Sequence, residues 1–188
     1  MNKYLILAKH SMPKIVESVP AREWKLSEEG RVRARRLAER LRSYQPEVIV
    51  SSIEPKAKET AEIIARKQNL TLQIVEGLHE HDRSQSQYLS QDEFQASVRK
   101  FFENPAILVF GSETADECYT RFNQAVQSIL DQYGDKTMVI VAHGTVISLF
   151  VSRLTGISDL FLWSELAFPS FVVIDMQSAL LIEKENSI

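Results

Sequence analysis

Short apolar runs alternate along the chain with longer stretches in which apolar residues recur every three or four positions. The runs are rich in Val, Ile and Leu and too short for helices, so they predict buried strands. They cover residues 4–8, 48–50, 70–75, 137–142 and 171–174. Because these strands alternate with helical patterns, we expect an α/β fold, a three-layer α/β/α sandwich with a mostly parallel central sheet.

Boundary residues predict four helices between these runs. Serine and threonine cap the free N–H groups of a first turn, proline suits the first helical position, and glycine or asparagine ends a helix. The starts are Ser27, Pro55, Thr114 with Glu117 in capping-box spacing, and Gly144, and the last three helices end at Asn69, Gly134 and Gly156.

The length of 188 residues suits one compact domain, and we expect residues 1–188 to form it. Residues 84–110 interrupt the alternation, because a polar stretch there precedes a predicted helix at about residues 92–102. We interpret this segment as a short cap-like insertion over one edge of the sheet.

Composition excludes several classes of partner. The formal net charge of −3, from 22 basic and 25 acidic residues, indicates neither a nucleic acid nor an anionic membrane as partner. The single cysteine, Cys118, excludes an internal disulfide and fits a reducing cytoplasm. No apolar run approaches the roughly 20 residues of a membrane span, and no secretion signal is evident, so we expect a cytoplasmic protein. The sequence does not indicate the oligomeric state.

Chemically active side chains follow the predicted strands. The groups are Lys9-His10-Ser11 after the first run, Ser51-Ser52 with Lys56 after the second, and His143-Gly144 after the fourth. Ligands of open α/β sheets bind beyond the carboxyl ends of the strands. We therefore expect these groups to surround one crevice.

Two imidazoles and two ammonium groups around a crevice indicate an anion with several oxygens, and a phosphoryl group fits best. A neutral imidazole nitrogen attacks phosphorus while cations neutralise the equatorial oxygens. On this interpretation His10 attacks, and Gly144 allows close backbone approach and presents N–H groups to the anion. His79, His81 and Asp82 lack a further ligand cluster, so we expect no metal site and no cofactor.

Five blocks of the sequence resemble, in order, those of the histidine phosphatase superfamily, also called phosphoglycerate-mutase-like. The family shows Arg-His-Gly, Leu-Thr/Ser-x-x-Gly, Ser-Ser-x-x-x-Arg-Ala-x-x-Thr-Ala, Leu-x-Glu and a late Ser/Ala-His-Gly. The matching blocks here are Lys9-His10-Ser11, residues 26–30, residues 51–61, Leu78-His79-Glu80 and Ala142-His143-Gly144. Ordered blocks over roughly residues 3–176 are far more specific than any one motif.

The resemblance implies roles for individual residues. It implies that His10 is the phosphorylated nucleophile and that His143 contacts the transferring phosphoryl group. Lys9 and Lys56 take the positions of the family's two phosphate-binding arginines. Glu80 takes the position of the proton donor to the leaving oxygen in many members. A donor must be protonated as that oxygen leaves, so we expect surroundings that raise the pKa of its carboxyl.

Two further positions bear on the site that the resemblance implies. Glu113, in a Gly-Ser-Glu-Thr segment before a helix, is a second candidate for the proton donor. Ser11 replaces the family's glycine and adds a hydroxyl beside the nucleophile, where it either crowds the phosphate or donates to it.

The resemblance implies a metal-independent phosphatase that hydrolyses phosphoric monoesters, of a small molecule or a phosphoprotein, through a phosphohistidine. The alternative is a phosphate-binding or regulatory protein with little turnover, since Lys9 and Lys56 keep the charge of arginine but lose its bidentate geometry. Phosphoglycerate mutase is disfavoured, because family mutases are usually longer and only a short insertion is present here.

Overall fold

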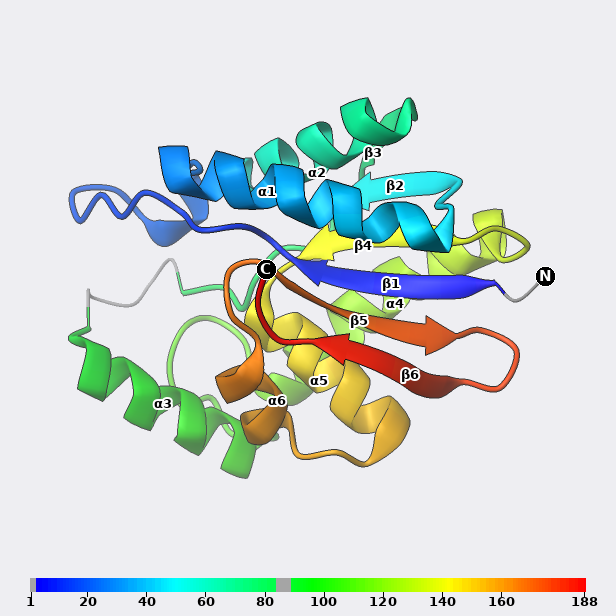
Figure 1. Ribbon diagram of the computed structural model, residues 1–188. Coiled ribbons are helices and arrows are strands. Elements are labelled where there is room, and N and C mark those ends of the chain that lie inside the picture. The colour runs from blue at the N-terminus through cyan, green and yellow to red at the C-terminus, as the bar shows by residue number, and fades with distance from the viewer. Residues whose placement is uncertain (1–2, 84–88) are drawn as a thin grey trace.

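A computed structural model describes residues 3–83 and 89–188 and contains a six-stranded sheet between two layers of helices (Figure 1). The strands are β1 (Tyr4–Lys9), β2 (Val48–Ser51), β3 (Leu72–Ile74), β4 (Met138–Ala142), β5 (Ser170–Asp175) and β6 (Leu180–Glu185). The helices are α1 (Glu28–Leu41), α2 (Pro55–Gln68), α3 (Gln91–Glu103), α4 (Ala115–Tyr133), α5 (Gly144–Thr155) and α6 (Asp159–Glu165), with short 3-10 helices at Ala21–Glu23 and Arg42–Tyr44.

The sheet has the strand order β3-β2-β4-β1-β5-β6. The first four strands in this order pair in parallel, whereas β5 runs antiparallel to β1 and β6 antiparallel to β5. The mostly parallel α/β sheet predicted from the sequence is therefore confirmed, with β6 and α6 as elements that the prediction missed.

Alternating residues of the strands face opposite layers. Ile6 and Ala8 of β1 pack in a cluster with the apolar sides of α1 and α2. Leu5 and Leu7 point the other way, into a larger cluster that includes residues of α3, α4 and α5. Figure 1 shows the same division, with α1 and α2 on one side of the sheet and α4 and α5 on the other. A strand side-chain period of two produces this pattern.

The predicted helix boundaries agree with the structure. The Ser27 hydroxyl accepts a hydrogen bond from the Gly30 N–H at 2.9 Å, and Thr114 and Glu117 form the full capping box of α4. Helix α2 begins at Pro55, and Asn69 ends it in the left-handed conformation. Because each cap satisfies N–H or C=O groups that the helix leaves free, these residues fix where the helices begin and end.

Helix α3 lies where the sequence predicted a helix in the insertion, while residues 84–88 of that insertion lie outside the described residues. Its buried residues Val98, Phe101 and Phe102 join the larger cluster. Among the described residues, no helix has both the length and the apolar character needed to cross a bilayer.

The start of α1 packs directly on the loop that follows β1. The Ser27 N–H donates to the Met12 carbonyl at 3.0 Å, and the Ser11 hydroxyl donates to the Gly30 carbonyl at 2.7 Å. A Cβ atom added at Gly30 would lie 2.1 Å from the Met12 oxygen. The glycine is therefore required by close backbone approach, and it holds the loop directly after His10.

We predict that Gly30→Ala lowers the free energy of unfolding by about 2 kcal/mol, because the new methyl group meets backbone that cannot give way. Urea denaturation should show a lower midpoint with an unchanged slope. The control is Arg35→Ala, which removes an exposed side chain from the same helix and should leave the midpoint within error. Equal midpoints for the two variants would contradict the close-approach explanation.

Candidate active site

Parallel pairing brings the ends of β1, β2 and β4 to one edge of the sheet. Lys9 pairs with Ala142 in the β1–β4 register, and the His10 N–H donates to the Ala142 carbonyl at 3.0 Å. The Ser52 N–H donates to the Val141 carbonyl, also at 3.0 Å. The convergence predicted from the three strand ends is therefore present.

The two imidazoles at this edge lie against each other. Their ring centroids are 5.1 Å apart, with an edge-on angle of 62°. Nδ1 of His10 lies 2.8 Å from the Ser11 carbonyl, which can only accept, so Nδ1 carries the proton. Burial, together with His143 and Lys56, holds the pKa of His10 well below its usual value. His10 is therefore neutral near pH 7, with the lone pair on Nε2.

His143 is fully buried at the start of α5. Its Nε2 atom lies 2.8 Å from the Ser52 hydroxyl, and its buried Nδ1 finds no partner among the described residues. Burial and the charge of Lys56 hold the pKa of this imidazole well below the ordinary value. An unpaired buried nitrogen is costly, and a phosphoryl oxygen is one kind of group that would pair with it.

Lys9 is a buried ammonium group with internal partners. Its Nζ donates to the Leu166 carbonyl at 2.6 Å and lies 3.8 Å from the ring centroid of Phe168. Burial lowers its pKa from 10.5 to about 8, although the carboxylate of Glu80 acts in the opposite direction. Lys9 is thus charged near neutral pH and loses its charge as the pH rises through about 8.

Lys56 is held by a residue that the sequence interpretation missed. Its Nζ lies 2.5 Å from Oε2 of Glu54 and donates to the Ala21 carbonyl at 2.7 Å. Both side chains of this ion pair are almost fully buried, with exposed fractions of 6% and 7%. Oε1 of Glu54 lies 3.6 Å from Nε2 of His143. A carboxylate therefore lies inside the group of cations and imidazoles.

Glu80 reaches the same group from the segment after β3. Its Oε2 accepts the Thr145 N–H at 3.2 Å, and its own N–H donates to Glu54 at 2.8 Å. Burial acts to raise the pKa of Glu80, but His143, the Arg83 guanidinium and the His81 N–H together lower it. The expectation of a raised pKa is therefore wrong, because the neighbouring charges and the His81 N–H outweigh desolvation.

Glu113 has a different environment. Arg121 binds its carboxylate at 2.6 Å, and the same guanidinium donates to the Gly77 and His79 carbonyls at 2.7 and 3.0 Å. This arrangement ties α4 to the segment that carries Glu80 and lowers the pKa of Glu113 against the opposing effect of burial. Glu80 thus lies with the basic groups of the site, whereas Glu113 is paired with Arg121.

The small residues beside the imidazoles make close contacts. The Ser11 hydroxyl is directed to the Gly30 carbonyl, and its N–H donates to Thr60 Oγ1 at 3.0 Å. A Cβ atom at Gly144 would lie 3.2 Å from Nζ of Lys9, so the glycine lets the lysine cross the start of α5. The Ser11 hydroxyl is therefore already hydrogen-bonded within the protein. The missing side chain at Gly144 leaves room for the Lys9 ammonium group.

Arg83 is a second residue that the sequence interpretation missed. Its guanidinium lies 4.8 Å from the ring centroid of Phe94 in α3 and contributes to lowering the pKa values of Glu80 and His143. In the sequence, only its positive charge and its position three residues after Glu80 could have indicated a place in the site. Its place beside the site depends on α3, which packs through Phe94.

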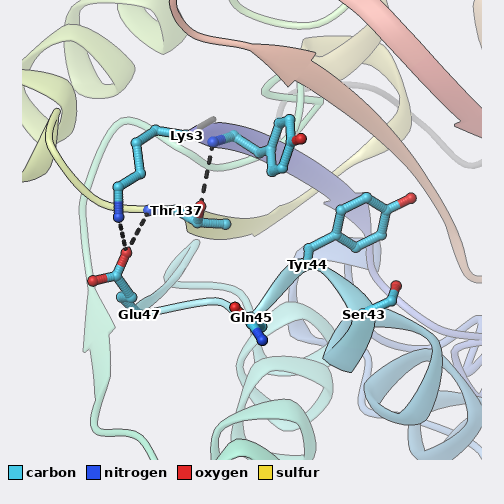
Figure 2. Close-up of a pocket in the computed structure, with 7 residues that line it drawn as sticks. Lys3, Ser43, Tyr44, Gln45, Glu47 and Thr137 are labelled. Atoms are coloured by element: carbon cyan, nitrogen blue, oxygen red, sulfur yellow. Dashed lines mark hydrogen bonds and ion pairs between the residues drawn. The ribbon is translucent and has the colours of Figure 1, made fainter. Parts of the chain in front are cut away.

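A separate hollow of about 520 Å³ lies at the opposite, amino edge of the sheet (Figure 2). The residues that line it are Lys3, Tyr4, Ser43, Tyr44, Gln45, Glu47 and Thr137. Glu47 accepts from the Lys3 ammonium at 2.6 Å and from the Thr137 N–H at 3.1 Å. Because its charges already pair with each other, this hollow is a poor anion site. Among described residues, no group of three or more His, Cys, Asp or Glu side chains is arranged to hold a metal ion.

The sequence of residues 18–178 matches the family model of the histidine phosphatase superfamily, branch 1. The chain belongs to the histidine phosphatase superfamily. The matched range includes Lys56, Glu80 and His143 but begins after His10, so the first triplet of this family member is assigned through the motif resemblance and the geometry above.

The chain is similar to known phosphatases in sequence and in structure. The uncharacterized phosphatase PhoE of Bacillus subtilis is 25% identical over 131 residues, which span 70% of this chain and 65% of that protein. Among solved structures, mycobacterial glucosyl-3-phosphoglycerate phosphatase matches with a TM-score of 0.80 at 21% identity, over 100% of both chains. A phosphoserine phosphatase of Entamoeba histolytica, solved with 3-phosphoglyceric acid, matches at 0.79 and 19% identity, over 97% and 96% of the two chains. At these identities the structures show the fold, which is that of phosphoglycerate-mutase-like phosphatases.

We predict that the pKa of Lys9 lies well below the ordinary value for lysine. After reductive methylation with a carbon-13 label, one dimethyl-lysine resonance should shift with a midpoint near pH 8, because burial disfavours the charged form. Surface lysines titrate at about 10.4. The Lys9→Arg variant should lack that resonance and no other. A Lys9 signal that moves together with the surface lysines would contradict the burial described above.

Proposed function

We propose that this protein is a metal-independent phosphatase that hydrolyses phosphoric monoesters through a phosphohistidine at His10. The observation that carries the proposal is the state of the His10 ring, whose Nδ1 proton is bound by the Ser11 carbonyl while Nε2 is left unprotonated. A buried neutral imidazole next to two ammonium groups suits attack on phosphorus.

In the first step, Nε2 of His10 forms a bond to phosphorus as the bond to the ester oxygen breaks. Lys9 and Lys56 neutralise charge on the equatorial oxygens, and the N–H groups at the start of α5 add hydrogen bonds to them. Glu80 gives a proton to the leaving oxygen. An incoming phosphoryl group adds negative charge beside this carboxyl and so raises its pKa, against the lowering by the neighbouring groups of the protein.

In the second step, water attacks phosphorus and the bond to His10 breaks, which releases inorganic phosphate and restores the neutral imidazole. Glu80, ionised after the first step, takes a proton from the water. His143 lies against the His10 ring throughout and binds the transferring group through its neutral imidazole. No step needs a metal or a cofactor.

The substrate class that we propose is a phosphorylated small molecule, with a phosphoprotein as the second possibility. Glucosyl-3-phosphoglycerate phosphatase and phosphoserine phosphatase share the fold and act, by their names, on small phosphate esters. Arg83, supported by Phe94 of the insertion, supplies positive charge next to Glu80, which gives its proton to the leaving oxygen as that oxygen separates from phosphorus.

We predict that hydrolysis of an aryl phosphate near pH 6 falls by at least about 10³-fold in His10→Ala, because the nucleophile is lost. The wild type should resist a metal chelator and be inhibited by vanadate, a mimic of five-coordinate phosphorus. Rapid acid-free quenching should trap a phosphoenzyme that is labile to acid and stable to alkali, as a phosphohistidine is.

Circular dichroism should show that His10→Ala keeps the fold. Activity that persists in this variant, or that a chelator abolishes in the wild type, would contradict the proposed mechanism. Incubation with 3-phosphoglycerate and its bisphosphate activator separates a mutase from a phosphatase, and we expect no isomerised product.

The alternative function, phosphate binding with little turnover, is favoured by one observation. Both ammonium groups already have partners within the protein, the Leu166 carbonyl for Lys9 and the Glu54 carboxylate for Lys56. Lysine also lacks the bidentate fork of arginine. A site of this kind would bind phosphate yet stabilise the transition state weakly.

We predict for this alternative that the double variant Lys9→Arg, Lys56→Arg raises kcat/KM for an aryl phosphate by about tenfold or more, since one preorganised donor is worth on the order of 3 kcal/mol. Lys67→Arg, an exposed change in α2, is the matched control and should have no effect. Unchanged activity in the double variant would count against weakened binding by the two lysines.

A further inference from the structure

Glu54 places a carboxylate beside Lys56, a group proposed to bind an anion. Glu54 lies between Ile53 and Pro55, and the proline directs its backbone into an extended conformation at the N-cap of α2. Its side chain does not cap that helix. The carboxylate instead enters the cluster of basic groups, where it is only 6% exposed.

The contacts of Glu54 use both carboxylate oxygens. Oε2 pairs with the Lys56 ammonium at 2.5 Å, and Oε1 accepts the Glu80 N–H at 2.8 Å. The ionisable groups that face it come from three segments: Lys56 of α2, His143 at the end of β4, and His79 and Glu80 after β3. Glu54 is therefore held in place, and its negative charge lies next to the group that should bind phosphate.

The two ammonium groups are consequently unequal. Lys9 is paired with a neutral carbonyl and an aromatic ring, so its charge is available to an anion. Lys56 has three N–H donors, of which one goes to the Ala21 carbonyl and one to Glu54, leaving one for a phosphoryl oxygen. With both imidazoles neutral, two carboxylates, Glu54 and Glu80, offset the two ammonium groups, and Arg83 adds a positive charge on the side of Glu80.

We propose that Glu54 is a specificity-determining residue that weakens the pocket for a phosphoryl dianion and favours a phosphoryl group that carries a proton. A dianion brings like charge against the fixed carboxylate, whereas a protonated phosphoryl group brings less charge and a donor that Glu54 can accept. This inference rests on the proposed function for the identity of the ligand. It does not require that the protein hydrolyses that ligand.

The test compares the wild type with Glu54→Gln by calorimetric titration with inorganic phosphate. Glutamine removes the charge but keeps the size of the side chain and one acceptor oxygen, which can take the place of the carboxylate oxygen facing either Lys56 or the Glu80 N–H. At about pH 7.5, where much of the phosphate is dianion, Glu54→Gln should bind roughly tenfold more tightly. At about pH 5.5, where phosphate is mostly monoanion, the gain should shrink to roughly threefold or less. The ionisation of Lys9 affects both proteins alike and does not alter the comparison.

The control is Glu62→Gln, the same substitution at an exposed position of α2, which should bind phosphate as the wild type does at both pH values. A Glu54→Gln variant that binds as weakly as the wild type, or that gains equally at both pH values, would overturn the inference. Weaker binding would assign Glu54 the opposite role of holding Lys56 in place, and absence of binding in both proteins would also overturn the inference. Tighter binding without any phosphatase activity in either protein would leave the inference standing and refute the proposed function.

A second readout guards against a general structural effect. The variant Glu54→Asp keeps the charge but shortens the side chain, and it should retain the weak binding of dianionic phosphate at about pH 7.5. If Glu54→Asp gains affinity as Glu54→Gln does, packing rather than charge controls the pocket, and the inference is wrong.

Discussion

The parallel register between β1 and β4 is the constraint on which the site depends. It pairs Lys9 with Ala142, so the residues that follow, His10 and His143, emerge side by side. A slip of one residue would turn every side chain of a strand to the opposite face, where it would no longer fit the core that now surrounds it. The cores on both sides of the sheet therefore hold the two imidazoles together.

Desolvation is the second organising effect, and it acts differently on the two kinds of base. Burial leaves the imidazoles neutral, whereas Lys9 keeps its charge near neutral pH with the help of Glu80, and Lys56 is ion-paired with Glu54. Buried charges require such partners, because an unpaired charge in a low-dielectric site is costly. The buried cations of the site thus account for the acidic groups that lie beside them.

Much of the fold was predictable because its signals are local. Ser27, Pro55 and Thr114 each start a helix through hydrogen bonds or backbone angles within a few residues, and the structure agrees with each. Strand β6 was not predictable in the same way. Its Leu180 and Ile182 are half exposed on an edge strand, so its pattern resembles that of a surface segment.

The site was predictable only in part. A motif shows which residue follows a strand, but it does not show which side chains from other segments surround that residue. The two histidines were found from their positions. The orientation of Glu54 depends on contacts with Lys56 and Glu80, which lie 2 and 26 positions away. The low pKa of Glu80 likewise arises from donors on other segments, which no local pattern records.

The close approach of Gly30 to Met12 has a consequence for how such a site can diversify. The loop after His10 and the start of α1 share backbone hydrogen bonds and leave no room for a side chain between them, so they form one rigid wall. Variation there would disturb the nucleophile. A second wall, formed by Arg83 and by Phe94 of α3, acts on the site through side chains, and Phe94 belongs to the insertion. New substrate preferences would therefore arise by changes in that wall, while the wall of the nucleophile stays constant.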